Sequence, residues 1–161
     1  AGRKKTIIFL RTGKKVSPVV TEAALLMDRH IAHACAIGDD LKYLIGVVEP
    51  NFEYLGEWLE KNGLMTFGPK DFELYKGMSK QEYQDAMAKR KQVIQMPEVI
   101  EFYNKIVQDA QQNLSSFERI KRFVLVPEEW TEYNVLTPSM KMKRRDIVNR
   151  YQQLIDSIYE E

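Results

Sequence analysis

The stretch Ala32-His33-Ala34-Cys35-Ala36-Ile37, followed after five residues by Tyr43-Leu44-Ile45-Gly46-Val47-Val48, decides the fold. Both runs are almost continuously apolar and have the length of a strand, and the connection Gly38–Lys42 is short enough to join antiparallel neighbours. Strands that are apolar on both faces need cover on both sides, or small residues that permit close packing. The sequence therefore predicts a buried antiparallel pair at the centre of the domain.

Upstream of this pair, the sequence predicts a hairpin and a helix. Ile7–Leu10 and Lys15–Val16 flank a turn in which Gly13 is able to take the positive φ of a hairpin tip. Ser17 then acts as N-cap and Pro18 as the first helical residue. The expected apolar face of this helix comprises Val20, Ala23, Ala24 and Met27, and its expected last turn contains Arg29 and His30.

Downstream of the pair, Asn51 caps a predicted helix that ends at Gly63. Segment 64–96 follows as a helical insert, whose main helix opens with a capping box formed by Ser79 and Glu82. The apolar face of that helix is modest and comprises Tyr83, Met87 and Ile94. We therefore expect a surface helix there.

Pro97 breaks the insert helix and begins another, with an apolar stripe made of Val99, Phe102 or Tyr103, Ile106 and Ala110. Arg122–Pro127 is the next predicted strand. The closing helix places Ile147, Tyr151, Leu154 and Ile158 on one face. The predicted class is α+β, with a small mixed or antiparallel sheet of about three strands and a separate N-terminal β-hairpin, covered by several helices.

Composition limits the function classes. The chain of 161 residues is 44% hydrophobic, which fits one domain with its own core, and its net charge of +1 argues against a dedicated nucleic-acid binder. The single Cys35 lies in an apolar run, which predicts a buried and inert thiol. His30 and His33 have no cysteine or acidic ligand at metal spacing, so no metal site is expected.

The sequence also bears on the cellular compartment and on whether the chain is part of a longer protein. No apolar stretch approaches the ~18 residues that a membrane span needs, and no signal peptide is present. We expect a reduced, cytoplasmic setting, in which peripheral contact with the inner membrane face stays open. The chain begins with Ala1, and a strand pattern follows Gly2-Arg3-Lys4-Lys5 at once, which favours a fragment of a longer protein.

The stretch Leu136-Thr137-Pro138-Ser139-Met140-Lys141-Met142-Lys143-Arg144-Arg145 carries the chemical signal. In an extended chain, Lys141 and Lys143 point one way and the two methionines point the other. Two ammonium groups on a single edge suit phosphate oxygens. On its own, a short basic run of this kind is more often solvated surface.

In this order, three blocks resemble the C-terminal domain of the acyl-adenylate-forming enzymes, especially the long-chain fatty-acid–CoA ligase branch. The first block comprises Gly2–Ile8, Thr12–Pro18 and Glu22, and is similar to the Gly-Arg opening, the glycine-tipped hairpin and the Pro-x-x-x-Glu helix start of that family. The second comprises Ala36–Asp39, Tyr43, Leu44 and Pro50. The third is Leu136–Arg145, similar to Leu-Thr-Pro-Thr-x-Lys-x-Lys-Arg, with Ser139 in place of threonine and Met140 where other branches have glycine.

The resemblance implies that residues 1–161 form the mobile lid of a ligase that makes acyl-AMP from a fatty acid and Mg-ATP and then transfers the acyl group to CoA. Its own N-terminal adenylation domain, outside this chain, would hold the fatty acid and most of the nucleotide, so the chain alone is expected to be inactive. The lid would comprise a hinge and hairpin (1–18), the insert (64–96) and a lysine loop (136–145). ATP, Mg²⁺ and CoA are the implied cofactors, and the lid alone would bind none of them stably.

The resemblance also implies residue roles. Lys141 matches the lysine that stabilises charge on the departing pyrophosphate, and Gly13 matches a glycine beside the CoA arm, although a turn that needs positive φ explains Gly13 as well. Lys5 matches the hinge, and Arg3 matches an arginine near the nucleotide ribose. Lys143, Arg144 and Arg145 either contact CoA phosphates or form a solvated basic rim. Glu22 is expected to have a structural role in its helix.

Two other functions stay open at this point. A related lid domain would pass the acyl group to the phosphopantetheine of a carrier protein instead of to free CoA. A stand-alone basic module would dock phosphate-rich partners through Lys141–Arg145, although the low net charge argues against it.

Overall fold

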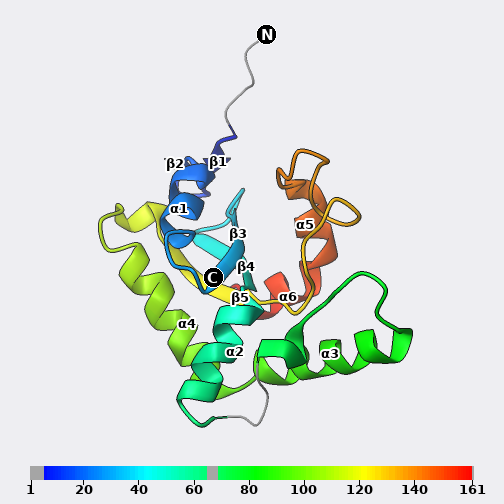
Figure 1. The fold of residues 1–161 in the computed structure, drawn as a ribbon. Coiled ribbons are helices and arrows are strands. Elements are labelled where there is room, and N and C mark those ends of the chain that lie inside the picture. Colours follow the sequence, from blue (N-terminus) through cyan, green and yellow to red (C-terminus); the bar gives the residue numbers. More distant parts are fainter. Residues whose placement is uncertain (1–5, 65–68, 161) are drawn as a thin grey trace.

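The computed structural model describes residues 6–64 and 69–160 (Figure 1). In chain order the elements are β1 (Ile8–Phe9), β2 (Lys15–Val16), α1 (Pro18–Leu25), β3 (Ile31–Ile37), β4 (Leu44–Pro50), α2 (Phe52–Lys61), the 3-10 helix η1 (Pro69–Phe72), α3 (Lys80–Val93), α4 (Pro97–Ala110), the 3-10 helix η2 (Ser116–Glu118), β5 (Ile120–Leu125), α5 (Arg144–Arg150) and α6 (Gln152–Ile158). β1 and β2 form an antiparallel hairpin, and β3, β4 and β5 form a mixed three-stranded sheet. The predicted α+β class is confirmed.

The central strand of the sheet is β4, which pairs antiparallel with β3 and parallel with β5. Val47 of β4 lies opposite Cys35 on one side and Val124 on the other. The antiparallel pair is therefore confirmed. The third strand begins and ends two residues earlier than predicted, because Ile120 already pairs with Leu44 before the charged residues that obscure the pattern.

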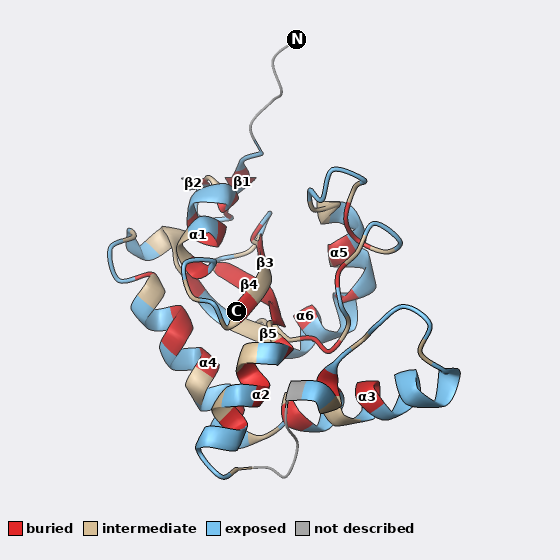
Figure 2. Cartoon of the chain, viewed as in Figure 1, coloured by how far each residue is buried: buried red, intermediate tan, exposed pale blue. Residues whose placement is uncertain are grey.

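Each face of the sheet carries its own core, because side chains alternate along a strand. Leu44 and Val48 of β4 point into one core, which residues of α1, α2 and α4 complete. Ile45 and Val47 point into the other, which residues of α5 and α6 cover. Figure 2 shows the buried residues gathered on the sheet and on the helix sides that face it.

Helix α1 differs from the prediction in length and in orientation. It ends at Leu25 and therefore does not include Arg29 and His30. Its buried residues are Pro18, Thr21, Glu22 and Leu25, whereas Val20 is 46% exposed and Met27, beyond the helix end, is 86% exposed. The polar residues are buried because they have partners: Thr21 Oγ1 donates to the carbonyl of Glu118 (2.6 Å), and Glu22 accepts from the backbone of Ala36 (2.7 Å). Hydrophobic spacing alone therefore assigned the wrong face.

The closing segment is two short helices rather than one. α5 and α6 meet at Tyr151, whose φ of −110° and ψ of 18° interrupt the helical path. The interruption brings Ile155 into the core and leaves Leu154 41% exposed, contrary to the prediction. The Tyr151 hydroxyl accepts a hydrogen bond from Trp130 Nε1 (3.0 Å), which holds the junction against the sheet.

The caps predicted for α2 and α3 are confirmed, whereas Ser17 occupies the N-cap position of α1 without a capping hydrogen bond from its side chain. The Asn51 side chain accepts from Tyr54 N (3.4 Å) at the start of α2, and Ser79 and Glu82 form a reciprocal capping box at the start of α3. Helix α3 lies at the opposite end of the molecule from the hairpin (Figure 1). Among the described residues, no helix has the length and apolar character that crossing a membrane requires.

Candidate functional site

The hairpin and the lysine loop (136–145) lie at the same end of the molecule, towards the top of the view in Figure 1. The hairpin tip is closed by hydrogen bonds from Leu10 N to the carbonyl of Lys14 and from Gly13 N to the carbonyl of Leu10, both 2.9 Å. Gly13 has a φ of +92°, and a Cβ placed there would meet nothing within 4 Å. The turn therefore requires positive φ, and the space beside Gly13 is open.

The turn between β3 and β4 fixes the hairpin to the sheet. Phe9 N donates to Asp39 Oδ1 (2.9 Å), and its carbonyl accepts from Asp40 N (3.0 Å). Gly38 permits the close approach, because a Cβ there would lie 2.5 Å from Leu44 Cδ2 and 3.0 Å from Ile8 Cγ2. The sequence placed Gly38 and Asp39 only in the connection between two strands, and their role in holding the hairpin was missed.

The lysine loop is a tight turn rather than a continuous extended strand. Met140 N donates to the carbonyl of Thr137 (2.8 Å), Thr137 N donates to the carbonyl of Lys141 (2.7 Å), and Met140 has a φ of +67°. Leu136 and Met142 then form an isolated antiparallel bridge. The predicted alternation is therefore wrong for the methionines, because Met140 is exposed at the turn while Met142 packs against the core.

Lys141 occupies the exposed side of this turn. Its backbone N donates to Thr137 Oγ1 (3.0 Å), which in turn lies 3.1 Å from Ser139 Oγ. Its side chain has no ion-pair partner within residues 6–64 and 69–160. Lys143 is half-buried at the N-cap of α5, and Arg145 is exposed in its first turn. A loop closed by hydrogen bonds thus presents to solvent an ammonium group that has no ion-pair partner among the described residues.

Arg144 is engaged within the domain. Its Nη1 and Nη2 donate to the two carboxylate oxygens of Glu22, at 2.7 and 2.6 Å, across 122 positions of sequence. The side chain of Glu22 is 5% exposed and that of Arg144 is 26% exposed. The bond to Glu22 raises the pKa of Arg144, so the guanidinium stays charged. Glu22 therefore has a structural role, as predicted, but between elements rather than within its helix.

Cys35 lies beside this pair, with its Sγ 4.0 Å from Arg144 Nη1. Burial, together with the charge of Glu22, raises the pKa of the thiol to about 12. The thiolate is the reactive form of cysteine. The thiol is consequently inert at neutral pH.

Arg3 and Lys5, predicted beside the ribose and at the hinge, lie outside the described residues.

The two histidines each contact one carboxylate. His30 Nδ1 lies 2.8 Å from Asp28 Oδ1, and His33 Nδ1 lies 2.5 Å from Glu49 Oε1. The described residues include no group of three or more His, Cys, Asp or Glu side chains arranged to hold a metal ion.

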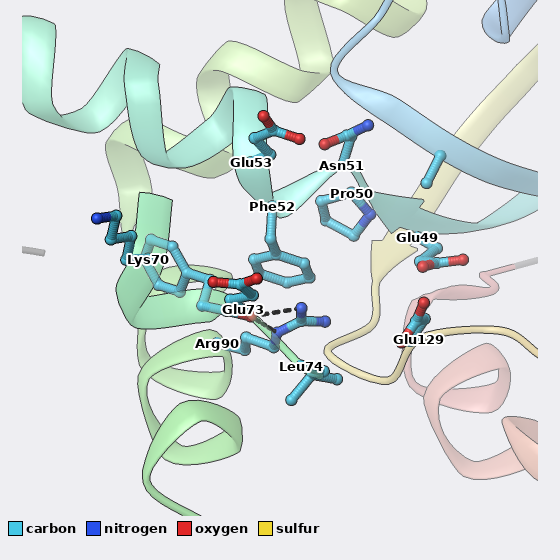
Figure 3. Close-up of a pocket in the computed structure, with 12 residues that line it drawn as sticks. Glu49, Pro50, Asn51, Phe52, Glu53, Lys70, Glu73, Leu74, Arg90 and Glu129 are labelled. Atoms are coloured by element: carbon cyan, nitrogen blue, oxygen red, sulfur yellow. Dashed lines mark hydrogen bonds between the residues drawn. The ribbon is translucent and has the colours of Figure 1, made fainter. Parts of the chain in front are cut away.

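A cavity of about 530 Å³ lies elsewhere, between α2, η1 and α3 (Figure 3). Arg90 is buried on its wall, where its Nε and Nη2 donate to the carbonyl of Phe72 and its Nη1 donates to that of Pro127. Burial lowers the pKa of Arg90, and burial raises the pKa of nearby Glu49. The hydrophobic pattern of α3 gave no sign of a buried arginine, and its contacts point to a structural role.

Comparison with known proteins places this geometry in a class. Residues 80–161 match the family described as the AMP-binding enzyme C-terminal domain. The long-chain-fatty-acid–CoA ligase FadD15 of Mycobacterium tuberculosis is 31% identical over 159 residues, which cover 98% of this chain and 23% of that protein. The human long-chain-fatty-acid–CoA ligase 1 is 28% identical over 159 residues, covering 98% of this chain and 20% of that protein. The chain thus spans about a fifth of the length of these relatives.

Solved structures share the fold. The A-PCP didomain of carboxylic acid reductase from Segniliparus rugosus superposes with a TM-score of 0.64 at 19% identity, covering 98% of this chain and 18% of that one. The adenylation domain of a carboxylate reductase from Mycobacterium chelonae gives a TM-score of 0.64 at 18% identity, covering 96% of this chain and 19% of that one. This chain belongs to the family of AMP-binding enzyme C-terminal domains.

Proposed function

We propose that this chain is the mobile C-terminal lid of a fatty-acid–CoA ligase, which activates a fatty acid as acyl-AMP with Mg-ATP and passes the acyl group to CoA. The observation that carries the proposal is the exposed Lys141, which forms no ion pair with any described residue and lies on a loop closed by hydrogen bonds. As pyrophosphate leaves, negative charge gathers on its oxygens, and an ammonium group held in place stabilises that charge without further reorganisation. Mg²⁺ would enter bound to the ATP phosphates.

The hairpin supports a role in the second half-reaction. Since a side chain at Gly13 would enter open space, the bare backbone there leaves room for the extended arm of CoA. Lys143 and Arg145 are the candidate contacts for CoA phosphates, whereas the guanidinium of Arg144 already bonds Glu22. Arg3 near the ribose and Lys5 as hinge stay predictions.

The surface around the hairpin fits contact with a larger domain. Ile7, Phe9, Val19 and Val20 are all at least 44% exposed, although they lie on or beside the hairpin and α1. Exposed apolar side chains that gather on one surface mark sites that bind another protein. We assign this surface to the N-terminal adenylation domain. A cytoplasmic enzyme with peripheral membrane contact stays part of the proposal.

The test uses the full-length ligase with Lys141→Ala. We expect adenylate formation, measured as ATP–pyrophosphate exchange, to fall by about 10²–10³-fold, while CoA attack on presynthesised acyl-adenylate changes little. Lys91→Ala, an exposed lysine on the distant α3, is the matched control. Equal loss in both half-reactions would remove Lys141 from the catalytic role. Transfer to a carrier protein but not to free CoA would instead establish the carrier-dependent alternative.

A further inference from the structure

We propose that the ion pair between Glu22 and Arg144 is a positioning clamp that holds Lys141 in place relative to the Gly13 hairpin. This inference rests on the proposed function, because it assigns roles to both loops. The clamp joins α1, which directly follows the hairpin, to Arg144, which is both the first residue of α5 and the second-last residue of the lysine loop. Its two members are thus attached to the two segments that the half-reactions use.

The geometry on the carboxylate side leaves little freedom. Glu22 Oε1 accepts from Arg144 Nη2 (2.6 Å), and Oε2 accepts both Arg144 Nη1 (2.7 Å) and Ala36 N (2.7 Å). A bidentate pair of this kind fixes orientation as well as distance. The bond to Ala36 attaches the same carboxylate to β3. Glu22 therefore fixes the guanidinium relative to the sheet, not only relative to α1.

The lysine loop depends on Arg144 at one of its two ends. Its N-terminal end is anchored by Val135 and Leu136, which are buried in the core. Its C-terminal end is anchored by the bond from Lys143 N to the carbonyl of Val135 (2.8 Å), and then by Arg144 itself. Lys141 lies only three positions before Arg144. A shift of Arg144 would therefore shift the catalytic ammonium group.

Stability alone does not account for such a pair. Well-packed apolar residues of similar volume are often as stable as a buried ion pair, because desolvation offsets much of the attraction. The ion pair adds a constraint on orientation, because its two hydrogen bonds fix the position of the start of α5 relative to α1. If it serves position, its loss should affect adenylation, which needs Lys141, more than thioester formation, because the hairpin keeps its own anchors at Asp39 and Asp40.

The experiment compares Arg144→Ala, Arg144→Lys and Glu22→Gln in the full-length ligase. With Arg144→Ala we expect kcat for adenylate formation to fall about 10–100-fold with KM for ATP almost unchanged, because small misplacements of a reacting group cost rates of this order. CoA attack on presynthesised acyl-adenylate should stay within about threefold, since it does not use Lys141. Arg144→Lys and Glu22→Gln, which keep part of the hydrogen bonding, should give intermediate losses.

Arg90→Ala is the control for simple destabilisation, because Arg90 is buried on the cavity wall (Figure 3) and belongs to α3, which lies at the other end of the molecule from both loops (Figure 1). It should lower the melting temperature without changing the ratio of the two half-reaction rates. If the Arg144 variants lose both half-reactions equally, or lose neither, the clamp is only structural and the proposal is overturned.

A second measurement separates failure of the clamp from failure of the proposed function. Amide hydrogen exchange in the same full-length protein should rise at least about tenfold at Lys141 and Lys143 in Arg144→Ala, while amides of β4 stay protected, because local opening exposes only the released segment. This holds even if the protein proves not to be a ligase. Unchanged exchange in the loop would show that Arg144 does not hold it, whatever the enzyme does.

Discussion

The guanidinium of Arg90 lies 4.2 Å from the centre of the Phe52 ring, so that a cation of α3 stacks on the first residue of α2. The same group donates to the carbonyls of Phe72 and Pro127. One side chain therefore connects α2, η1, α3 and the segment after β5. No carboxylate forms an ion pair with it in the described part of the chain.

Arg90→Ala should destabilise the protein by about 2–4 kcal/mol, because it leaves two buried carbonyls without their charged donor. Arg90→Lys should recover only part of this, since an ammonium group cannot reproduce the planar fork of donors. The measurement is the free energy of unfolding in urea. Lys91→Ala, the exposed neighbour on the same helix, should stay within about 0.5 kcal/mol of the parent. A loss of equal size in Lys91→Ala would contradict the connecting role.

Gly13 offers a test of whether open space at the hairpin serves a ligand. Asn tolerates positive φ better than other non-glycine residues. Gly13→Asn should therefore retain the hairpin, since nothing within 4 Å opposes its Cβ. In the full-length ligase we expect adenylate formation to survive and CoA attack on presynthesised acyl-adenylate to fall by about 10-fold or more, since small misplacements of a reacting group cost up to about 10²-fold.

Gly63→Asn is the matched control, because Gly63 also has positive φ (+62°) and open space around its Cβ, but ends α2. It should leave both half-reactions unchanged. Normal CoA attack in a well-folded Gly13→Asn variant would reduce Gly13 to a residue that serves only its turn.

Cys35 should resist alkylation in the folded protein. Its thiol is buried and its pKa is raised to about 12, so at pH 8 the reactive thiolate is scarce, and raising the pH towards that value should increase the rate. Iodoacetamide labelling followed by mass spectrometry measures this. The same thiol should label readily in urea, where its pKa returns to the ordinary range. Rapid labelling of the native protein at pH 8 would show that Cys35 is accessible.

The strands and caps were predictable because their signals are local. The apolar runs around Cys35 and Val47, the Asn51 cap and the Ser79–Glu82 box each depend on residues close in sequence. The buried face of α1 was not predictable, because Glu22 is buried through an ion pair with Arg144, 122 positions away in the sequence. Helix-face prediction from periodicity considers only the spacing of hydrophobic side chains, so it cannot identify a polar residue that is buried because its partner lies far away in the sequence.

The candidate site likewise has features that the sequence predicted and features that it did not. The order of motifs was enough to select Lys141 and Gly13 as candidates, but the turn at Met140 depends on the bridge between Leu136 and Met142. Arg90 escaped prediction for a different reason: a charged residue on a charged helix looks solvated until the carbonyls that it meets are known. Contacts with residues distant in sequence explain why Arg90 was missed, whereas the turn at Met140 is closed by residues no more than six positions apart.

The mixed pairing of β4 constrains the order in which this protein is able to fold. Its antiparallel partner β3 precedes it by a short turn, so only a short loop has to close before these two strands are able to pair. Its parallel partner β5 begins only at Ile120, after the α-helices α2, α3 and α4 and the 3-10 helices η1 and η2, and the cost of closing a chain loop must be met before a distant contact contributes. Until Ile120–Leu125 has been synthesised, the edge of β4 that pairs with β5 therefore lacks its partner, and an unpaired strand edge is a template for pairing with another chain.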